Sequence, residues 1–356
     1  MNKAMRNILV IAGAAVVMVA VAAISGILLE RFSGREQTVA PETLTAVANF
    51  TRGLQARYGD AMAISATLDE AEAAVTEGLG GAALDEAVAS SVLATLEQAT
   101  GAIDAFEGNL ANIGVRPRIG DSRDSGLRAY EDMVRGLTVH LRSQHALLRR
   151  ELEAAQAGDL SGFDRLRGES FGLARTMIEA ENIALEVGRY GVGSDHPQGS
   201  LIEATIGANL SAMAGLMLAE DWLRDEPVRL AAILDLSRQG VDRATRALAE
   251  GREKSARLRD RLGDDGPVVD GQSFAQALYD AYERAFAIED GIVAAMRSLN
   301  DALAQADPAH PDAEALSAAG DAFRGAIADL VARRMVEQNA RLVMMEDVAG
   351  RMAAGQ

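Results

Sequence analysis

The stretch LRAYEDMVRGLTVHLRSQHALL, residues 127–148, decides the fold of this chain. Its apolar side chains recur in alternating steps of three and four residues, and Gln144 is the one polar member of the series. This heptad spacing places the whole series on one face of an α-helix, a face that partner helices must cover. The stretch therefore predicts a helix within a bundle. The series comprises Leu127, Tyr130, Val134, Leu137, Leu141, Gln144 and Leu148.

Similar spacing continues on both sides of this stretch, with short breaks between the periodic segments. No segment of comparable length alternates apolar and polar residues at every second position, as a half-buried strand would. The clearest breaks lie at 78–81, 113–126, 157–159, 263–267 and 308–311. We therefore expect an all-α body whose eight helices cover about 41–77, 88–110, 127–156, 166–187, 202–223, 227–262, 274–302 and 316–345.

The break at 188–200, GRYGVGSDHPQGS, is rich in glycine and predicts the main internal boundary. Four helices on each side are enough for two tandem antiparallel four-helix bundles, over 41–190 and 200–356. One long continuous helical bundle is the alternative that the sequence leaves open. Ser200 and Glu203 have the spacing of a capping box, which predicts that the fifth helix starts there.

The fifth helix is apolar on most faces and has no charged residue from Thr205 to Ala219. It is therefore a candidate for a membrane span or for a buried core helix. This uncharged run is shorter than the roughly 20 residues that a transmembrane helix needs. It also contains Asn209 and Ser211. We expect a core helix.

A second apolar stretch lies near the amino terminus, where Ile8 to Leu29 contains no charged side chain. As a helix it would be about 33 Å long, enough to cross a bilayer core of about 30 Å. Lys3 and Arg6 precede it, and positive flanks stay on the cytoplasmic side. We expect a single-pass bacterial inner-membrane protein with a periplasmic body. Its parts are a cytoplasmic tail over 1–7, a transmembrane anchor over 8–29 and a linker over 30–40.

A cleaved signal peptide is the alternative to this anchor. The sequence Ala20-Val-Ala22 has the small-x-small form of a cleavage site, so cleavage would follow Ala22. The apolar run continues past this point to Leu29, beyond the roughly 7–15 apolar residues of a signal peptide. Both interpretations export the body of the protein.

The composition restricts the partners of the exported body. The chain has a net charge of −17, which repels nucleic acid and anionic lipid headgroups. It contains no cysteine, so disulfide bonds, thiol catalysis and thiolate metal sites are excluded. We expect partners among envelope or inner-membrane proteins, with a homo-oligomer left open.

Catalytic and metal-binding motifs are not evident. His140 and His145 are five residues apart, whereas metal-binding pairs on a helix are usually three or four apart. His196 and His310 fall in expected loops, and no Glu-x-x-His occurs. The sequence also lacks Gly-x-Ser-x-Gly, and its Gly-x-Gly strings do not follow a strand. We expect no enzyme activity, no cofactor and no metal site.

The eighth helix contains one polar interruption of its apolar face. Arg333, Arg334, Gln338 and Asn339 lie between Leu330 and Leu342. A partly buried arginine needs an acceptor, which is an internal carboxylate, a ligand or a partner protein. The residues are thus a candidate contact site for a carboxylate or an acidic helix, through the bidentate geometry of arginine. A polar layer that fixes the helix register, or a solvated face, is the simpler interpretation.

A single amino-terminal anchor before an exported helical bundle resembles, in outline, the ectodomains of bacterial chemoreceptors. The resemblance implies a sensory role only together with a membrane partner, since no cytoplasmic signalling coiled coil follows here. Our first hypothesis is a non-enzymatic, membrane-anchored envelope interaction or scaffold protein, and the alternative is a sensory ectodomain that binds a small molecule. A concave polar site of several hundred cubic ångströms would favour the alternative, and exposed apolar stripes would favour a protein partner.

Overall fold

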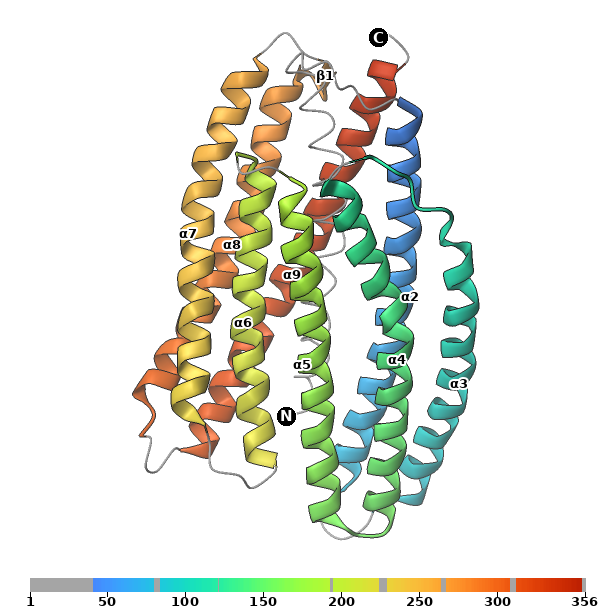
Figure 1. Ribbon diagram of the computed structural model, residues 1–356. Helices are drawn as coiled ribbons and strands as arrows, with labels where there is room; N and C mark the ends of the chain where they lie inside the picture. The colour runs from blue at the N-terminus through green and yellow to red at the C-terminus, as the bar shows by residue number, and fades with distance from the viewer. Residues whose placement is uncertain are drawn as a thin grey trace.

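The computed structural model describes residues 41–79, 84–120, 122–192, 195–223, 229–263, 267–307 and 312–353. These residues form eight α-helices, one 3₁₀ turn and a two-stranded hairpin (Figure 1). The all-α fold class is thereby confirmed. The helices are α2 (Pro41–Gly78), α3 (Glu86–Leu110), α4 (Ser122–Gln156), α5 (Leu160–Tyr190), α6 (Pro197–Leu223), α7 (Leu230–Leu262), α8 (Phe274–Gln305) and α9 (Ala313–Ala353).

Several expected helix starts were wrong, among them that of α5, which begins at Leu160 instead of about 166. Helix α4 begins at Ser122, inside the loop expected over 113–126, and Asp124 accepts hydrogen bonds from two backbone N–H groups just before the helix. Helix α6 begins at Pro197, so Ser200 lies inside the helix and is not a cap. The ring of His196 caps this helix instead, because Nδ1 accepts the backbone N–H of Gln198 at 3.0 Å. Proline at the first helical position is favourable, since its missing N–H would be unpaired there.

The short hairpin before α8 was not expected. Strands β1 (Val268–Val269) and β2 (Gln272–Ser273) pair antiparallel across Asp270 and Gly271. Both turn residues have positive φ angles, 49° and 84°. Asp-Gly is a sequence signal for such a turn, and it was overlooked.

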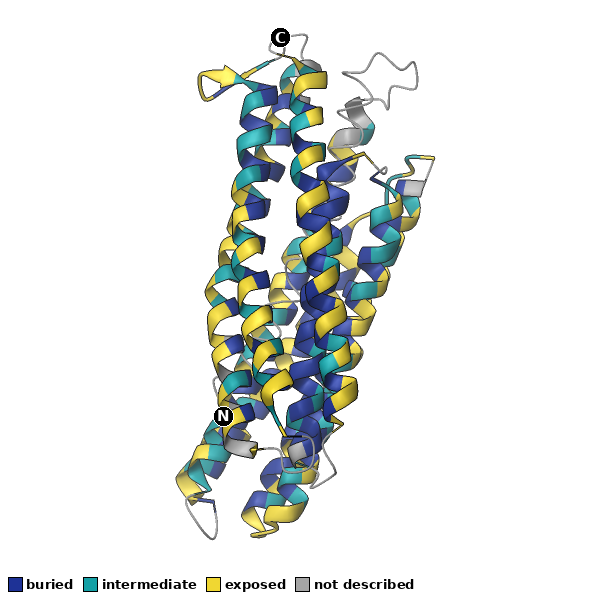
Figure 2. Ribbon diagram, turned by 90° about the vertical axis from the view of Figure 1, so that its left-hand side faces the viewer, coloured by how far each residue is buried: buried dark blue, intermediate teal, exposed yellow. Residues whose placement is uncertain are grey.

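The helices form two neighbouring groups within one elongated body. In one group α2, α3, α4 and α5 pack against one another in chain order, and in the other α6, α7, α8 and α9 do so. Helices α5 and α6 lie side by side, and α9 contacts α2, so the two groups meet at two places (Figure 1). Buried residues line the inward faces of the helices (Figure 2).

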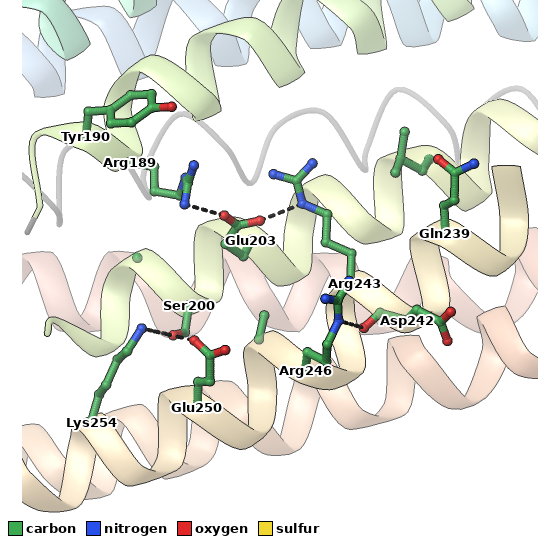
Figure 3. Close-up of a pocket in the computed structure, with 13 residues that line it drawn as sticks. Arg189, Tyr190, Ser200, Glu203, Gln239, Asp242, Arg243, Arg246, Glu250 and Lys254 are labelled. Carbon is green, nitrogen blue, oxygen red and sulfur yellow. Dashed lines mark hydrogen bonds and ion pairs between the residues drawn. The ribbon is translucent and has the colours of Figure 1, made fainter. Parts of the chain in front are cut away.

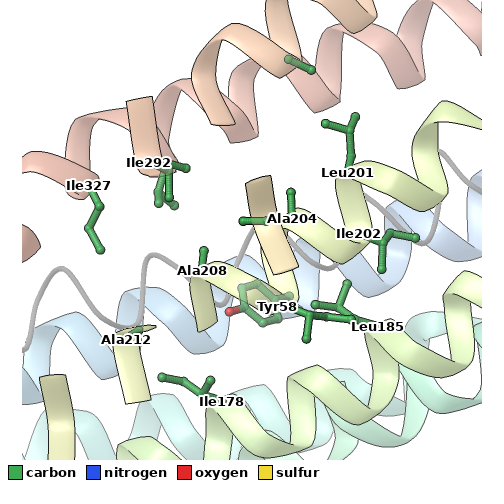
Figure 4. Close-up of a cluster of buried hydrophobic side chains, with 14 of the residues drawn as sticks. Tyr58, Ile178, Leu185, Leu201, Ile202, Ala204, Ala208, Ala212, Ile292 and Ile327 are labelled. Atoms are coloured by element: carbon green, nitrogen blue, oxygen red, sulfur yellow. The ribbon is translucent and has the colours of Figure 1, made fainter. Parts of the chain in front are cut away.

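One hydrophobic cluster crosses between the two groups. Figure 4 places Tyr58 of α2 near Leu185 of α5 and Ile202 of α6, with Ile292 of α8 in the same cluster. A smaller cluster, around Leu68, fills the far end of α2 to α5. The apolar core therefore continues across the boundary expected at 188–200. Independent folding of the bundles 41–190 and 200–356 stays a prediction.

Helix α6 is the one described helix that is long and apolar enough to cross a membrane, over Pro197–Asp221. In its most apolar window, 78% of the residues are buried inside the protein, as expected for a core helix. It approaches α7 closely, since a Cβ atom on Gly207 would lie 2.6 Å from the carbonyl oxygen of Gly240. The tail, anchor and linker expected over 1–7, 8–29 and 30–40 lie outside the described residues.

Candidate functional site

Arg334 of α9 is paired inside the protein. Its side chain is 3% exposed and faces Glu289 of α8, which is 3% exposed as well. The Nη2 atom donates a hydrogen bond to Oε2 of Glu289 at 2.6 Å, and Nε lies 2.5 Å from Oε1. Of the three acceptors considered from the sequence, Arg334 therefore uses an internal carboxylate.

The other three α9 residues of the expected site have different surroundings. Arg333 is exposed and lies 3.9 Å from a carboxylate one turn earlier in α9. Gln338 is buried on the face of Arg334, and its Oε1 has no hydrogen-bond partner among the described residues. Asn339 accepts a hydrogen bond from Gln55 of α2. The structure thus brings Arg334 and Gln338 to one face and separates Arg333 and Asn339 from them.

Arg341 extends this buried face. It was not among the site residues predicted from the sequence. It is 1% exposed, and its Nη1 donates a hydrogen bond to Oε1 of Gln198 at 3.1 Å. Its guanidinium carbon lies 5.0 Å from the centre of the Tyr282 ring. In the described part of the chain it forms no ion pair with a carboxylate, and burial lowers the pKa of Arg341 below its ordinary value. The spacing could have indicated this, because Arg341 follows Arg334 by seven residues, which places both on the same face of the helix two turns apart.

We call Glu289, Arg334, Gln338 and Arg341 the arginine cluster. Leu201 of α6 and apolar residues of α8 close it, and the space between these side chains has no room for a water molecule. Burial raises the pKa of Glu289, although the neighbouring Arg334 pulls it down. A filled cluster of this kind holds helices in register, and it offers no preformed cavity for a ligand.

A second buried polar cluster lies between α2, α4 and α5. It contains Asp69 and Glu72 of α2, Glu151 of α4 and Arg167 of α5, which are 4%, 7%, 0% and 5% exposed. The Nε atom of Arg167 lies 3.6 Å from Oε1 of Glu72. Arg167 thus pairs with Glu72, and its charge also lowers the pKa of Glu151. We call these four residues the acidic cluster.

Burial changes the protonation of the acidic cluster. It raises the pKa of Asp69 to about 7, partly offset by a hydrogen bond from Gln144. It also raises the pKa of Glu151 to about 7, against a hydrogen bond from Ser170 at 2.8 Å. The pKa of Glu72 is raised well above its ordinary range, first by burial and then by the two other carboxyl groups. Asp69 and Glu151 therefore bind protons near neutral pH.

An open groove of about 830 Å³ runs along α6 between the end of α5 and the middle of α7 (Figure 3). Nothing in the sequence pattern indicated it, because its walls come from three different helices and depend on how these pack together. Most of its lining residues are polar or charged. The lining residues are Arg189, Tyr190, Gly199, Ser200, Glu203, Leu210, Gln239, Asp242, Arg243, Arg246, Ala247, Glu250 and Lys254.

Glu203 of α6 joins the two walls of this groove. Its Oε1 lies 2.6 Å from Nη1 of Arg189 on α5, and its Oε2 lies 2.5 Å from Nε of Arg243 on α7. Glu186 pairs with the same two arginines. Burial lowers the pKa of Arg243, but the hydrogen bonds from its guanidinium to Glu186 and Glu203 raise it further, so the net pKa is above the ordinary value. The groove floor is thereby fixed in shape.

Two further cations stand at the open side of the groove. Arg246 is exposed, and its Nε donates to the backbone oxygen of Asp242 at 3.3 Å. It forms no ion pair within the described residues. Lys254 donates to the hydroxyl of Ser200 at 3.2 Å and lies 3.4 Å from Glu250. Arg246 is therefore the groove cation with most freedom to bind an external acceptor.

The histidines do not gather into a site in the described part of the chain. His145 bonds through Nε2 to the backbone oxygen of Leu96 at 3.0 Å, whereas burial lowers the pKa of His140 to about 4. His310 lies outside the described residues. No group of three or more histidine or carboxylate side chains has metal-binding geometry in the parts that were described. The expectation that no metal is bound stays a prediction.

No protein-family model, no curated protein and no solved structure matches this chain. The functional inference therefore rests on the groove, the two buried clusters and the exposed faces of the helices.

Proposed function

We propose that the protein is a non-enzymatic, membrane-anchored interaction protein of the bacterial cell envelope, and that it binds a segment of another envelope protein in the groove over α6. The groove is the observation that carries the proposal. Its α7 wall extends from Gln239 to Lys254, which corresponds to about 22 Å at 1.5 Å per residue. A groove of that length fits a helical or extended polypeptide segment.

The lining of the groove suits a polar segment with charges of both signs. Arg246 can donate hydrogen bonds to a carboxylate of the partner, and Asp242 and Glu250 on the same wall can pair with a basic side chain. The apolar side chains of the lining are those of Tyr190, Leu210 and Ala247. Small-molecule sites are lined mainly by apolar side chains and enclose most of the ligand, so the open polar lining favours a protein partner.

The groove is tested with a photo-crosslinking amino acid at Gln239 in the full chain, in native membranes. We expect a covalent adduct with a protein, and a several-fold lower yield when Arg246→Glu is added. Arg128→Glu is the matched control, because Arg128 of α4 is also exposed and forms no ion pair among the described residues. Equal adduct yields with both substitutions would reject the groove as the binding site.

Small-molecule capture is the second candidate function, and the size of the groove favours it. A volume of about 830 Å³ falls within the range of roughly 300–1,000 Å³ that is typical of ligand pockets. Native mass spectrometry of the purified full chain distinguishes the two functions. A bound small molecule that disappears in Arg246→Glu and persists in Arg128→Glu would replace our first proposal with this one.

The membrane-anchored, exported part of the proposal rests on residues 8–29 and their positive flank. A reporter enzyme that is active only outside the cytoplasm, fused after Gln356, should be active in cells. The same reporter fused after Arg31, directly behind the expected anchor, tests the orientation of the anchor without the rest of the chain. Inactive reporters at normal expression would place the body in the cytoplasm and exclude a periplasmic partner.

A further inference from the structure

One face of α9 is apolar and uncovered near its carboxyl end. Val336 and Val343 are 71% and 63% exposed, in contrast to the buried apolar residues on the opposite face. Ala332 and Ala340 are exposed on the same side as these valines. Steps of three and four residues join the four positions, so they form one strip along the helix. We call Ala332, Val336, Ala340 and Val343 the α9 stripe.

Charged residues continue the α9 stripe at both ends in an alternating order. Asp329 and Arg333 flank its amino-terminal end and are 80% and 65% exposed, and Asp347 and Arg351 follow its carboxyl-terminal end at 48% and 40%. Among the described residues each acid pairs with the base four residues later in the same helix, and Arg351 also donates to the backbone oxygen of Val268 at 2.9 Å. Exposed pairs of this kind contribute little to stability. The four charges can therefore re-pair with another molecule at small cost.

We infer that a second copy of this chain docks on the α9 stripe, with the two α9 helices antiparallel about a two-fold axis at Ala340. In this register Arg333 lies opposite Asp347 of the partner subunit, and Asp329 lies opposite Arg351 of the partner subunit. Val336 packs beside Val343 of the partner subunit. The surface is thus complementary to itself, which a two-fold interface requires.

The order of charges selects the antiparallel arrangement. In a parallel pair of equal register, Asp329 and Arg333 would each face an identical charge, which disfavours association. The antiparallel pair overlaps over residues 327–353, about 40 Å of helix at 1.5 Å per residue. Alanine at the axis lets the two helices approach closely, and the valines on either side fill the contact. This surface is separate from the groove over α6, so the inference goes beyond the proposed function.

Cysteine cross-linking tests the arrangement directly, because the chain has no cysteine of its own. Ala340→Cys in the full chain, purified in detergent, should form a disulfide-linked dimer under mild oxidation. The matched control is Ala318→Cys, which is exposed on the same side of α9 but lies outside the antiparallel overlap. A parallel pair would cross-link both positions. Efficient cross-linking at Ala318→Cys, or none at Ala340→Cys, overturns the proposal.

Mixed chains test the register. When differently tagged Val336→Cys and Val343→Cys chains are combined, the mixed dimer should form more readily than either homodimer. Predominant homodimers would mean a parallel pair and reject the inference. The membrane anchor is the same in all these chains, so any contribution from it cancels in the comparison.

Charge reversal tests the complementarity. Arg333→Asp should weaken dimer formation roughly tenfold, as sedimentation in detergent measures it, because two symmetric pairs become repulsive. Asp347→Arg alone should weaken it similarly, and the double substitution should restore the dimer. Full dimerisation in either single variant, or no recovery in the double variant, overturns the charge pairing on which the inference rests.

Discussion

The acidic cluster and the arginine cluster bury charges in similar helical surroundings, yet they differ in how those charges can be neutralised. The acidic cluster has three carboxyl groups and one guanidinium, and carboxyl groups can take up a proton when burial disfavours their charge. The arginine cluster has two guanidinium groups for one buried carboxylate, Glu289. Arginine keeps its proton at any ordinary pH.

This difference indicates that the two clusters respond to different perturbations. The acidic cluster adapts to pH because its pKa values lie near 7 for Asp69 and Glu151. The arginine cluster cannot adapt in this way, so it depends on fixed partners, Glu289 for Arg334 and Gln198 with the Tyr282 ring for Arg341. Removing a partner should therefore affect the arginine cluster most, and changing the pH should affect the acidic cluster most.

The largest expected effect comes from breaking the buried ion pair. Arg334→Ala leaves Glu289 buried without its guanidinium, and loss of one partner of a buried pair costs about 3–5 kcal/mol. The free energy of unfolding of the full chain, measured with urea, should fall by this amount. Arg149→Ala is the matched control, because the side chain of Arg149 is 64% exposed and pairs, among the described residues, only with an exposed carboxylate one turn later in α4, so its loss should change the free energy of unfolding by less than about 0.5 kcal/mol. Equal losses for both variants would contradict the pairing.

The next effect is the pH dependence of stability, to which the acidic cluster should contribute most. Burial raises the pKa of Asp69 from 3.8 to about 7 and that of Glu151 from 4.5 to about 7. A carboxyl with a raised folded pKa binds protons more tightly when folded, so stability decreases as pH rises from the unfolded value to the folded one. Each group then changes the free energy of unfolding by about 1.4 kcal/mol per pH unit within that window.

We therefore expect the double variant Asp69→Asn, Glu151→Gln to reduce the loss of stability between pH 5 and pH 8 by up to about 5 kcal/mol, since each group contributes over roughly two pH units. Urea titrations at pH 5 and pH 8 measure the free energy of unfolding of both chains, and hence this difference. Asp104→Asn on the exposed side of α3 is the control and should leave the pH slope unchanged. A double variant with the pH slope of the unmodified chain would mean that the cluster is hydrated or otherwise neutralised.

The fold could be predicted in most parts because its helices carry long, regular apolar series. Leu127 to Leu148 is an example, since all its apolar series members are buried in α4. Local capping was harder to predict, because Ser200 and His196 both precede apolar residues and only the packed structure distinguishes the cap. The Asp-Gly hairpin at 270–271 was available in the sequence and overlooked.

The candidate site was less predictable because α9 does not separate polar from apolar faces. Its exposed side carries Val336 and Ala340, whereas its buried side carries Arg334, Gln338 and Arg341. Polarity alone therefore could not tell which arginines were buried. The acidic cluster and the groove depend on which helices are neighbours, and that information is not contained in the spacing within any one helix.

The smallest expected effect concerns a single hydrogen bond in the acidic cluster, whose strength should depend on pH. The hydroxyl of Ser170 donates to Oε1 of Glu151 at 2.8 Å, and this bond lowers the pKa of Glu151. Hydrogen bonds to ionised groups contribute about 1.5–3 kcal/mol, and those between neutral groups about 0.5–1.5 kcal/mol. Ser170→Ala should therefore cost about 2 kcal/mol at pH 8.5, where Glu151 is ionised, and about 1 kcal/mol at pH 5.5, where it is protonated.

Urea unfolding at both pH values measures this difference. Ser298→Ala provides the matched control, because the hydroxyl of Ser298 is exposed and donates to the backbone oxygen of Ala294 at 3.3 Å. It should cost little at either pH. A Ser170→Ala cost that does not change with pH would show that Glu151 keeps one protonation state throughout. The contrast between a proton-binding acidic cluster and a fixed arginine cluster would then fail at Glu151, while the ion pair of Arg334 and Glu289 would stand unaffected.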